Sequence, residues 1–304
     1  MHPKHLIIIA GPTAIGKTSL AINLAQHFNT EIISADSRQA YREMVIGTAM
    51  PSVDQLAGVK HYFIGHHSIH DHYNASIFEL EAVEILERLF IHNDVAIMVG
   101  GSGMYIDAVC KGIDEFPTVD GTIREQLRNE YNSTGIKGIR AKLQLTDPEY
   151  YKKVDLNNPL RILKALEIVE MTGRPYSSFL TGKIKQRGFS TIRLGLDMPR
   201  KDLYNRINNR VNDMMAGGLL EEARNLYPYR KLNALKTVGY KELFDFLDGN
   251  CSLEQAVDKI KRHTRQYARR QLTWFRRDKD THWFTPYEIN EILDYIHLKL
   301  TDDG

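Results

Sequence analysis

The sequence predicts an α/β fold in which a parallel sheet carries helices on its faces. Short apolar runs with the length of buried strands occur at residues 5–10, 31–35, 61–65 and 95–99. Apolar residues with helical spacing occupy residues 17–27 and 76–92, between two pairs of these runs. Strands that alternate with helices are typical of a parallel sheet, in which ligands bind at the carboxyl ends of the strands.

A glycine-bounded turn follows the first predicted strand and fits the pattern Gly-x-x-x-x-Gly-Lys-Thr. Its glycines permit a tight turn that directs backbone N–H groups inward, and the start of the next helix adds partial positive charge. Lys17 adds a full charge, and the Thr18 hydroxyl suits Mg²⁺. Because pattern and context agree, we expect a P-loop NTPase-like core of the kind found in nucleotide-binding and ATP-binding proteins, and not a chance turn. The residues of this phosphate loop are Gly11, Pro12, Thr13, Ala14, Ile15, Gly16, Lys17 and Thr18.

A carboxylate, Asp36, directly follows the second predicted strand. The ends of parallel strands meet at one edge of the sheet, so Asp36 is expected to face the phosphate loop. There it could hold Mg²⁺ or accept a proton. It could equally cap the next helix, since Asp is a favoured N-cap residue, and the spacing alone does not decide between these roles.

The fourth predicted strand ends in a glycine-rich turn, residues 100–103, with the sequence GGSG. An ATPase usually places an acidic metal ligand after such a strand, so its absence weakens a simple ATPase interpretation. The glycines allow a close approach to the backbone. A plain strand-to-helix turn would not need three of them.

The composition changes after residue 113, and this change predicts a second domain. Residues 114–190 are polar, mostly helical in pattern and punctuated by proline, so we expect a helical insertion or lid there. The α/β core then comprises residues 1–113 and 191–304, with a strand-like run at 191–196 and a largely helical carboxyl-terminal region.

Two carboxyl-terminal helical segments are strongly basic. Arg206 and Arg210 lie four residues apart on one helix face and suit an anionic ligand, although a solvated face is the usual role of such a pair. Residues 254–277 carry a stripe of arginines beside aromatic residues, which favours an RNA backbone over an exposed helix without a partner. The arginines of this stripe are Arg262, Arg265, Arg269 and Arg276.

Composition excludes several classes of protein. The 304 residues are 42% hydrophobic and 26% charged, which is ordinary for a globular protein, and the net charge of +2 requires any nucleic-acid surface to be local. Cys110 and Cys251 lack zinc-ligand spacing and fit a reducing cytoplasm. No run has the length of a membrane span and none at the amino terminus fits a signal peptide, so we expect a cytoplasmic protein.

A group of histidines begins in the third predicted strand and continues into the segment that follows it. Composition alone resembles a metal-binding tract, but the spacing defines no ligand set, and we expect a polar surface loop. These residues are His61, His66, His67, His70 and His72.

Several motifs together resemble the IPP transferase family, the bacterial tRNA dimethylallyltransferases. The phosphate loop alone is shared by many families, whereas the combination and its order along nearly the whole chain are specific. The motifs are GPTAIGKT at 11–18, ISADSRQ at 33–39, IGTA at 46–49, VGGSGMY at 99–105, NPLRI at 158–162, VGY at 238–240 and RRQLTWFR at 269–276. No cysteines are present for the zinc finger that eukaryotic relatives add, which favours the bacterial form.

The resemblance implies transfer of a dimethylallyl group from dimethylallyl diphosphate to N6 of the adenosine on the 3′ side of the anticodon in tRNA. It implies that the phosphate loop holds the diphosphate of the donor, with Mg²⁺ near Thr18, and does not hydrolyse ATP. Asp36 would act as general base, Thr13 and Arg210 would assist, and Arg206 would bind the diphosphate. The protein is expected to be a monomer that needs no membrane.

The resemblance also implies contacts with tRNA, and the helical insertion would hold the anticodon stem-loop. The residues at the matching positions are Asp36, Ser37, Arg38, Gln39, Ser102, Arg124, Leu160, Arg161, Ile162, Leu163, Lys164, Lys236, Thr237, Val238, Gly239, Tyr240, Lys241, Arg269, Arg270, Gln271, Leu272, Thr273, Trp274, Phe275 and Arg276.

Two other functions remain open at this stage. A P-loop kinase of a small molecule or nucleoside would explain the phosphate loop and a lid, but not the arginine-rich helix. A non-catalytic RNA-binding ATPase module would explain both, but it would give Asp36 no role as a base.

Overall fold

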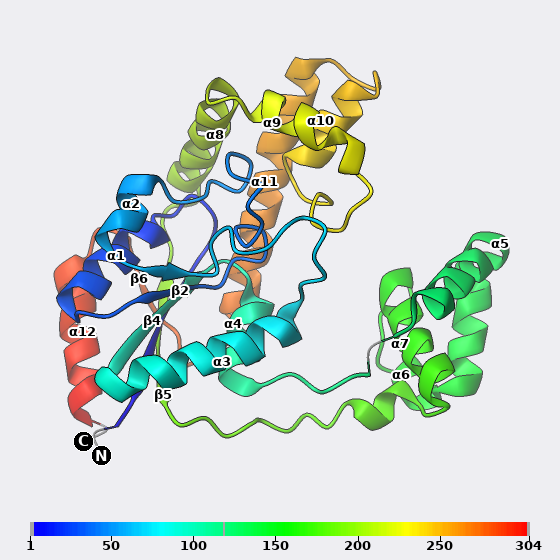
Figure 1. The fold of residues 1–304 in the computed structure, drawn as a ribbon, viewed down its shortest axis with the longest axis horizontal. Coiled ribbons are helices and arrows are strands. Elements are labelled where there is room, and N and C mark those ends of the chain that lie inside the picture. Colours follow the sequence, from blue (N-terminus) through cyan, green and yellow to red (C-terminus); the bar gives the residue numbers. More distant parts are fainter. Residues whose placement is uncertain (1–2, 118, 303–304) are drawn as a thin grey trace. The chain divides into compact units, whose positions relative to one another are not determined.

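A computed structural model describes residues 3–117 and 119–302. The chain divides into two compact units, which Figure 1 shows in ribbon form. The core unit runs through Lys111 and resumes at Gln186, and the insertion unit comprises Gly112–Lys185.

The core unit is built on a six-stranded parallel sheet, which confirms the predicted α/β fold. The strand order is β3-β2-β4-β1-β5-β6. The strands are β1 (His5–Ala10), β2 (Ile32–Ser34), β3 (His61–Tyr62), β4 (Val95–Gly100), β5 (Ser190–Leu196) and β6 (His282–Phe284). Ala10 at the end of β1 pairs with Gly100 and Gly195, and Ser34 pairs with Val99, so the turns after β1, β2 and β4 meet at one edge.

Burial explains why β1 is central. All six of its residues are buried, because a parallel strand in the middle of a sheet is covered on both faces. Ile7 and Ile9 pack on one face with Leu20 of α1 (Lys17–His27), and Ile8 faces Ile106 of α4 (Gly103–Lys111) on the other. Each fully buried side chain of this size contributes about 1.5–3 kcal/mol to the free energy of unfolding.

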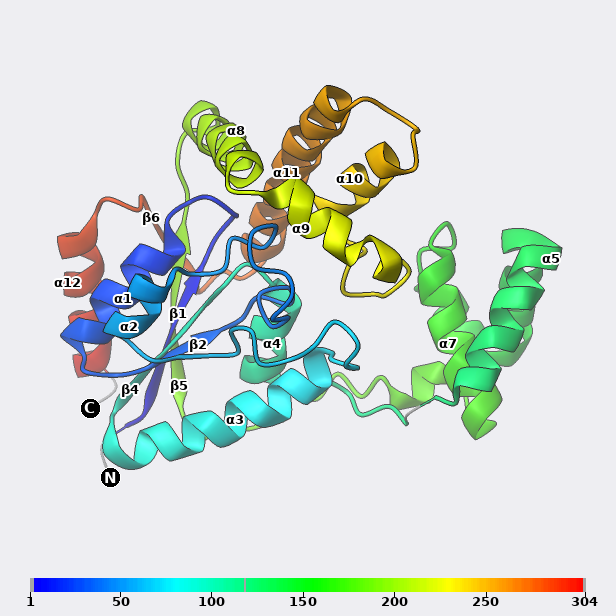
Figure 2. The ribbon, with the colours of Figure 1, turned by 45° about the horizontal axis from the view of Figure 1, so that its top comes forward.

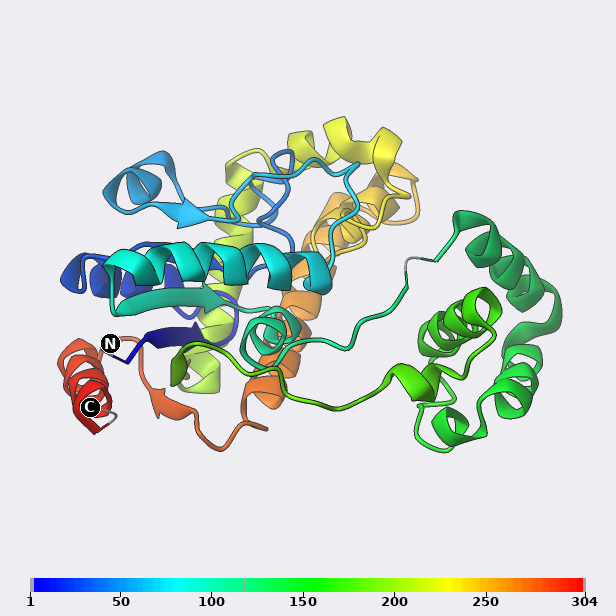
Figure 3. The same ribbon diagram turned by 60° about the horizontal axis from the view of Figure 1, so that its bottom comes forward.

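Helices cover both faces of the sheet. On the side of Ile8, α3 (Ala75–His92) packs against α4 through a tilted ring contact of Phe78 with Tyr105, whose centroids lie 4.7 Å apart. On the side of Ile7 and Ile9, α12 (Ile289–Asp302) packs against the sheet near β5 and β6 (Figure 3). A short helix, α2 (Val53–Gly58), precedes β3.

The carboxyl-terminal helices of the core unit lie over the carboxyl ends of the strands and stand out in Figure 2. They are α8 (Arg200–Ala216), α9 (Leu219–Leu226), the short 3₁₀ helix Tyr227–Tyr229, α10 (Tyr240–Leu247) and α11 (Leu253–Phe275). A capping box between Ser252 and Gln255 starts α11 at the position where the basic pattern begins.

The insertion unit has its own small core. Its helices are α5 (Gly121–Thr146), α6 (Pro148–Tyr151), α7 (Pro159–Thr172) and the 3₁₀ helix Tyr176–Phe179. Gly135 has a φ of 66° and kinks α5, so that both halves of this helix pack on α7 around Leu143 and Leu166. The buried Asp147 caps α6 through Tyr150 and also accepts hydrogen bonds from Ser177.

Three expectations differ from the structure. The third strand ends at Tyr62 and not at residue 65, because Phe63 has a left-handed backbone with φ of 66°. Residues 186–190, which we assigned to the insertion, belong to the core unit, where Arg187 donates to Glu79 (2.7 Å) and to the Ala108 carbonyl (3.1 Å). The strand β6 was not predicted, since three residues are too short to show a period.

Among residues 3–117 and 119–302, no helix has the length and apolar character required to cross a bilayer.

Candidate active site

The phosphate loop lies between β1 and α1, where the sequence places it. Gly16 precedes α1 with a φ of 110°, a conformation that glycine adopts at little cost. Lys17 Nζ donates a hydrogen bond across the loop to the Pro12 carbonyl at 2.8 Å. Burial lowers the pKa of Lys17 to about 7, Asp36 opposes this shift and Arg210 adds to it.

The loop opens into a first cavity of about 410 Å³. Parts of the chain that are far apart in sequence meet here, because this is the edge at which the strands end. The cavity is lined by residues 13–18, Asp36, Arg206, Arg210, Tyr267 and Gln271, among others.

Two arginines of α8 enter this cavity one helical turn apart, as their spacing predicts. Arg210 Nη1 donates to Thr13 Oγ1 at 3.4 Å, and Arg206 Nη1 donates to the hydroxyl of Tyr287 at 3.1 Å. Burial lowers the pKa of Arg210, which Asp36 opposes and Arg206 reinforces. Together with Lys17, these side chains concentrate positive charge beside the phosphate loop.

One carboxylate oxygen of Asp36 accepts hydrogen bonds from the backbone, and the other accepts none within the described structure. Its Oδ1 accepts hydrogen bonds from the backbone N–H groups of Arg38 (2.9 Å) and Gln39 (3.3 Å). The predicted capping role is therefore present, but it caps a turn and not a helix. Among the residues that the structure describes, Oδ2 has no hydrogen-bond partner, and Asp36 lines the cavity.

A second cavity of about 560 Å³ adjoins the first. Five residues line both cavities: Thr13, Asp36, Thr48, Arg210 and Tyr267. The remaining wall of the second cavity includes residues 236–239, Lys241, His263, Gln266 and Arg270. Two ligands bound in the two cavities would therefore meet beside Asp36.

Tyr267 of α11 belongs to the shared wall, which its position among the aromatic residues of the arginine-rich segment did not predict. Burial raises its pKa to about 12, and Asp36 adds to the shift. Its hydroxyl therefore keeps its proton at neutral pH.

Gln271 was predicted to contact tRNA, but the structure buries it against the phosphate loop. Its Oε1 accepts from the backbone N–H of Thr13 (2.9 Å), and its Nε2 donates to the carbonyl of Gly101 (2.9 Å). A single glutamine therefore joins the phosphate loop to the glycine-rich turn. The only sequence signal was an uncharged polar residue within a basic stretch.

The glycine-rich turn at residues 100–103 needs its glycines because other atoms of the protein lie where their side chains would be. A Cβ atom on Gly100 would lie 2.1 Å from the carbonyl oxygen of Ala35, and one on Gly101 would lie 2.2 Å from Gln271 Nε2. A Cβ atom on Gly103 would lie 2.2 Å from the Trp274 ring. The close approach that the sequence predicted is thus made by protein atoms.

Several other side chains expected at a tRNA interface have partners within the core unit. Arg38 donates to the carbonyls of Asn233 and Ala234 (both 3.1 Å) and so holds the segment that precedes residues 236–241. Ser102 Oγ accepts from the N–H of Ser37 at 3.1 Å. Gln39 Nε2 donates to the carbonyls at positions 48 and 49.

Two arginines of the stripe on α11 have partners within the core unit. Arg265 donates to Asn208 (2.7 Å), and Arg276 pairs with Asp197. Trp274 donates to Asp107 at 2.9 Å, and Phe275 is buried. The exposed basic side chains that line the second cavity include Lys236, Lys241 and Arg270, and Arg269 is exposed next to Arg270 on α11.

The predicted tRNA residues of the insertion unit separate into core and surface. Ile162 and Leu163 are buried in the core of this unit, and Arg124 pairs with Glu167 at 3.2 Å. Leu160 and Arg161 are exposed at the start of α7, and Lys164 is half-buried there.

Glu222 is a residue that sequence reasoning missed. Its carboxylate accepts from the backbone N–H groups of Val45 (2.9 Å), Ile46 (2.7 Å) and Gly47 (2.9 Å) and from the hydroxyl of the fully buried Tyr240 (2.7 Å). This contact fixes the loop that carries Thr48 into the cavities. No local pattern distinguishes Glu222 from the exposed Glu221 beside it.

Comparison with known proteins agrees with the resemblance. The model of a family described as IPP transferase matches residues 39–278. A tRNA dimethylallyltransferase 1 of Phocaeicola vulgatus is 52% identical over 295 residues, which cover 97% of this chain and 98% of that protein. A tRNA dimethylallyltransferase of Christiangramia forsetii is 53% identical over 298 residues, covering 98% and 99%.

Two solved structures resemble the chain over most of its length. A tRNA isopentenylpyrophosphate transferase of Bacillus halodurans is 36% identical with a TM-score of 0.72, covering 99% of this chain and 98% of that one. A eukaryotic dimethylallyltransferase acting on tRNA is 28% identical with a TM-score of 0.79, covering 94% and 75%. Because a family model matches most of the chain and relatives about half identical to it span almost all of it, the chain belongs to the IPP transferase family of enzymes.

Proposed function

We propose that this enzyme transfers a dimethylallyl group from dimethylallyl diphosphate to N6 of the adenosine 3′ to the anticodon in tRNA. The observation that carries the proposal is the junction of two cavities at Asp36, one of them rich in cations. The named activities of the relatives agree with it. A donor diphosphate in the first cavity and an extruded base in the second would place their reacting atoms beside this carboxylate.

The cationic side chains would stabilise the leaving group. As the C1–O bond of the allylic diphosphate breaks, its electron pair passes to the diphosphate oxygen and negative charge grows there. Lys17, Arg210 and the backbone N–H groups of the phosphate loop are positioned to balance that charge, and Arg206 adds to the field. Thr13, which Arg210 contacts, would hold a diphosphate oxygen.

Mg²⁺ fits the donor atoms of the first cavity. It keeps several waters and is typically held by one or two protein oxygens together with substrate phosphates. The Thr18 hydroxyl lines the cavity and has no hydrogen bond among the described residues. We propose that Thr18 holds the ion, whose charge would neutralise part of the diphosphate charge.

Asp36 would act on the nucleophile. The lone pair of the adenine N6 forms the new bond to C1, and the nitrogen becomes cationic and acidic. Asp36 Oδ2, which is free of internal hydrogen bonds in the described structure, would accept the proton, while Oδ1 stays bound to the turn at Arg38 and Gln39. A weak carboxylate base is sufficient because the proton that it takes comes from an acidic group.

The tRNA would approach from the side of the second cavity. A base stacked in the anticodon loop must be extruded to reach a buried site. Lys236, Lys241 and Arg270 supply positive charge at that opening, and Arg269 is exposed on the same helix as Arg270. We propose that the insertion unit holds the anticodon stem-loop and that the enzyme acts as a monomer.

A direct test is to incubate the enzyme with labelled dimethylallyl diphosphate, Mg²⁺ and unmodified tRNA, and to identify the nucleoside after digestion. We expect label in N6-(dimethylallyl)adenosine. ADP formation from ATP with a nucleoside, without transfer of label to tRNA, would instead identify a kinase.

A further inference from the structure

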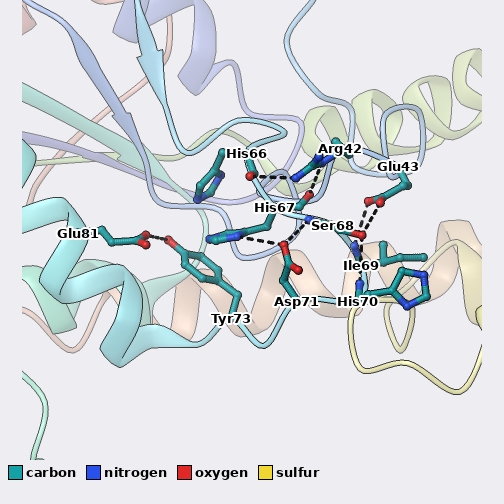
Figure 4. Close-up of polar contacts among 10 residues, drawn as sticks. All are labelled: Arg42, Glu43, His66, His67, Ser68, Ile69, His70, Asp71, Tyr73 and Glu81. Atoms are coloured by element: carbon teal, nitrogen blue, oxygen red, sulfur yellow. Dashed lines mark hydrogen bonds and ion pairs between the residues drawn. The ribbon is translucent and has the colours of Figure 1, made fainter.

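A cluster of candidate metal ligands lies outside the two cavities, in the segment that joins β3 to α3 (Figure 4). His66, His67 and Glu81 each offer one ligand atom, and these atoms lie within 4.8 Å of one another. None of the three lines either cavity of the candidate active site. The sequence predicted only a polar loop here, because Glu81 comes from the following helix.

The backbone of this segment brings the two histidines together. Phe63 and Gly65 have positive φ angles of 66° and 57°, so the chain turns sharply just before the pair. The N–H of His67 then donates to the Ala40 carbonyl, and its carbonyl accepts from the N–H of Arg42 (both 2.9 Å). The two imidazole centroids lie 4.1 Å apart.

Neighbouring side chains hold the loop in this shape before any ion binds. The carboxylate of Glu43 accepts from Ser68 Oγ (2.7 Å) and from the N–H of Ile69 (3.0 Å). Arg42 Nε donates to the carbonyl of His67 at 3.2 Å (Figure 4). A preorganised loop lowers the cost of binding an ion.

His67 is the most informative residue of the cluster. Its Nδ1 lies 3.4 Å from Asp71 Oδ2, while its Nε2 is buried and has no hydrogen-bond partner among the described residues. A metal-binding histidine is typically oriented in this way, with one ring nitrogen on a carboxylate and the other on the ion. A buried ring nitrogen without a partner is otherwise unfavourable.

Glu81 supplies the oxygen ligand. Tyr73 donates from its hydroxyl to Glu81 Oε2 at 2.9 Å, which fixes the carboxylate against the His67 ring. Glu81 Oε1 has no hydrogen bond among the described residues. His66 is the exposed member of the cluster, and its imidazole supplies the third ligand atom.

We propose that His66, His67 and Glu81 bind a divalent transition metal ion of the Zn²⁺ type, with water as a fourth ligand. Two imidazoles and one carboxylate form a typical ligand set for Zn²⁺, whereas Mg²⁺ prefers oxygen atoms alone. Ligand atoms about 2.0–2.1 Å from an ion lie roughly 3.3–3.4 Å apart in a tetrahedron. Binding would draw the three ligand atoms, which lie within 4.8 Å of one another, together to this spacing.

The ion would link the loop to α3 and thereby support the active site. The loop pairs with residues 40–42, directly after the turn that Asp36 caps. The expected effect of the ion is therefore on the fold of this segment, and the site is separate from the Mg²⁺ proposed at Thr18.

The test uses the full chain without a histidine tag, freed of metal with a chelator. Titration with Co²⁺ is expected to give the visible absorption of a tetrahedral complex at one ion per chain, and Zn²⁺ is expected to displace it. His67→Ala and the isosteric Glu81→Gln are each expected to weaken Co²⁺ binding at least tenfold. Asp71→Asn is expected to weaken it roughly 10–100-fold, because Asp71 orients His67.

His72→Ala is the matched control, since His72 is an exposed histidine of the same loop outside the cluster. Zn²⁺ is expected to raise the Tm of the unmodified chain and of this control, but not that of Glu81→Gln. The proposal is overturned if the unmodified chain shows no tetrahedral Co²⁺ spectrum. It is equally overturned if His67→Ala and Glu81→Gln bind Co²⁺ as tightly as the control does.

Discussion

Gln271 Oε1 accepts a hydrogen bond from the backbone N–H of Thr13, 258 positions earlier in the chain, at 2.9 Å. The same side chain donates to the Gly101 carbonyl. One residue of α11 therefore aligns the phosphate loop with the glycine-rich turn, and through that turn with the end of β2. The geometry of the site depends on a contact between the last long helix and the first loop.

Replacing Gln271 by Ala should weaken both the fold and the site. Two buried polar backbone groups would lose their partner, which costs about 1–3 kcal/mol for each unsatisfied group. We expect a lower midpoint of chemical unfolding and a higher KM for dimethylallyl diphosphate. Gln144→Ala, at an exposed position on α5, should change neither quantity.

Asp36→Asn should separate the two roles of Asp36. The amide oxygen can still accept from Arg38 and Gln39, so the turn should keep its shape. Loss of the base should lower the single-turnover rate by about 10²–10⁴-fold. Asp36→Ala should abolish transfer while tRNA affinity is largely kept, as measured by filter binding. If tRNA affinity falls along with the rate in both variants, Asp36 is structural.

Binding of diphosphate should be coupled to uptake of a proton by Lys17. In the free enzyme the pKa of Lys17 is lowered to about 7, so at pH 8 most of this amine is neutral. A bound anion favours the charged form and raises that pKa. Calorimetric titration of diphosphate in buffers of different ionisation enthalpy should show the uptake, and Lys17→Met should remove it.

The same shift predicts the sign of a pH effect on stability. The folded pKa lies below the unfolded value of 10.5, so between about pH 7 and 10.5 the unfolded state binds more protons at Lys17. The free energy of unfolding of the ligand-free enzyme, relative to that of Lys17→Met, should therefore rise with pH across this window. A difference that is constant or falls would show that Lys17 is normally charged in the folded chain.

Arg269 should contribute to tRNA binding through charge. It is exposed on α11, so Arg269→Ala should reduce the slope of log affinity against log salt by about one ion per lost phosphate contact. Arg276→Ala is the informative comparison, because Arg276 already pairs with Asp197 and should change the slope less. An unchanged slope in Arg269→Ala would remove that residue from the tRNA-binding surface.

Glu222→Ala should destabilise the core unit strongly. It would leave three backbone N–H groups of residues 45–47 and the buried hydroxyl of Tyr240 without their acceptor, at a cost of at least about 3 kcal/mol. The neighbouring Glu221→Ala is a matched control. Glu221 is exposed and pairs with Arg224 at the surface, so its removal should cost no more than about 0.5 kcal/mol in urea unfolding.

Much of the core could be predicted from local sequence. The buried run of β1, the glycine-bounded phosphate loop and the start of α1 follow one another directly, and each has its own pattern of residues. Arg206 and Arg210 share a helix face because they are four residues apart. By contrast, β6 is only three residues long. It is recognisable as a strand because it pairs with β5 at the end of the sheet.

The roles of several polar residues could be assigned only in the tertiary structure. The contact of Glu222 with Gly47 joins residues 175 positions apart, and Glu81 reaches the histidine loop only after α3 has folded. The resemblance implied that Gln271 and Arg276 contact tRNA, and both have partners inside the core unit.

The physical reason is the range over which each property is encoded. Strand and helix periods and the phosphate loop depend on residues within about one turn of one another, so sequence determines them and, with the order of the motifs, the family. Whether a polar side chain faces solvent or satisfies a buried donor depends on which distant segment packs against it. Which segments pack together is set by the tertiary structure. The tertiary structure therefore determined which polar side chains of this protein have internal partners and which remain available to bind a ligand.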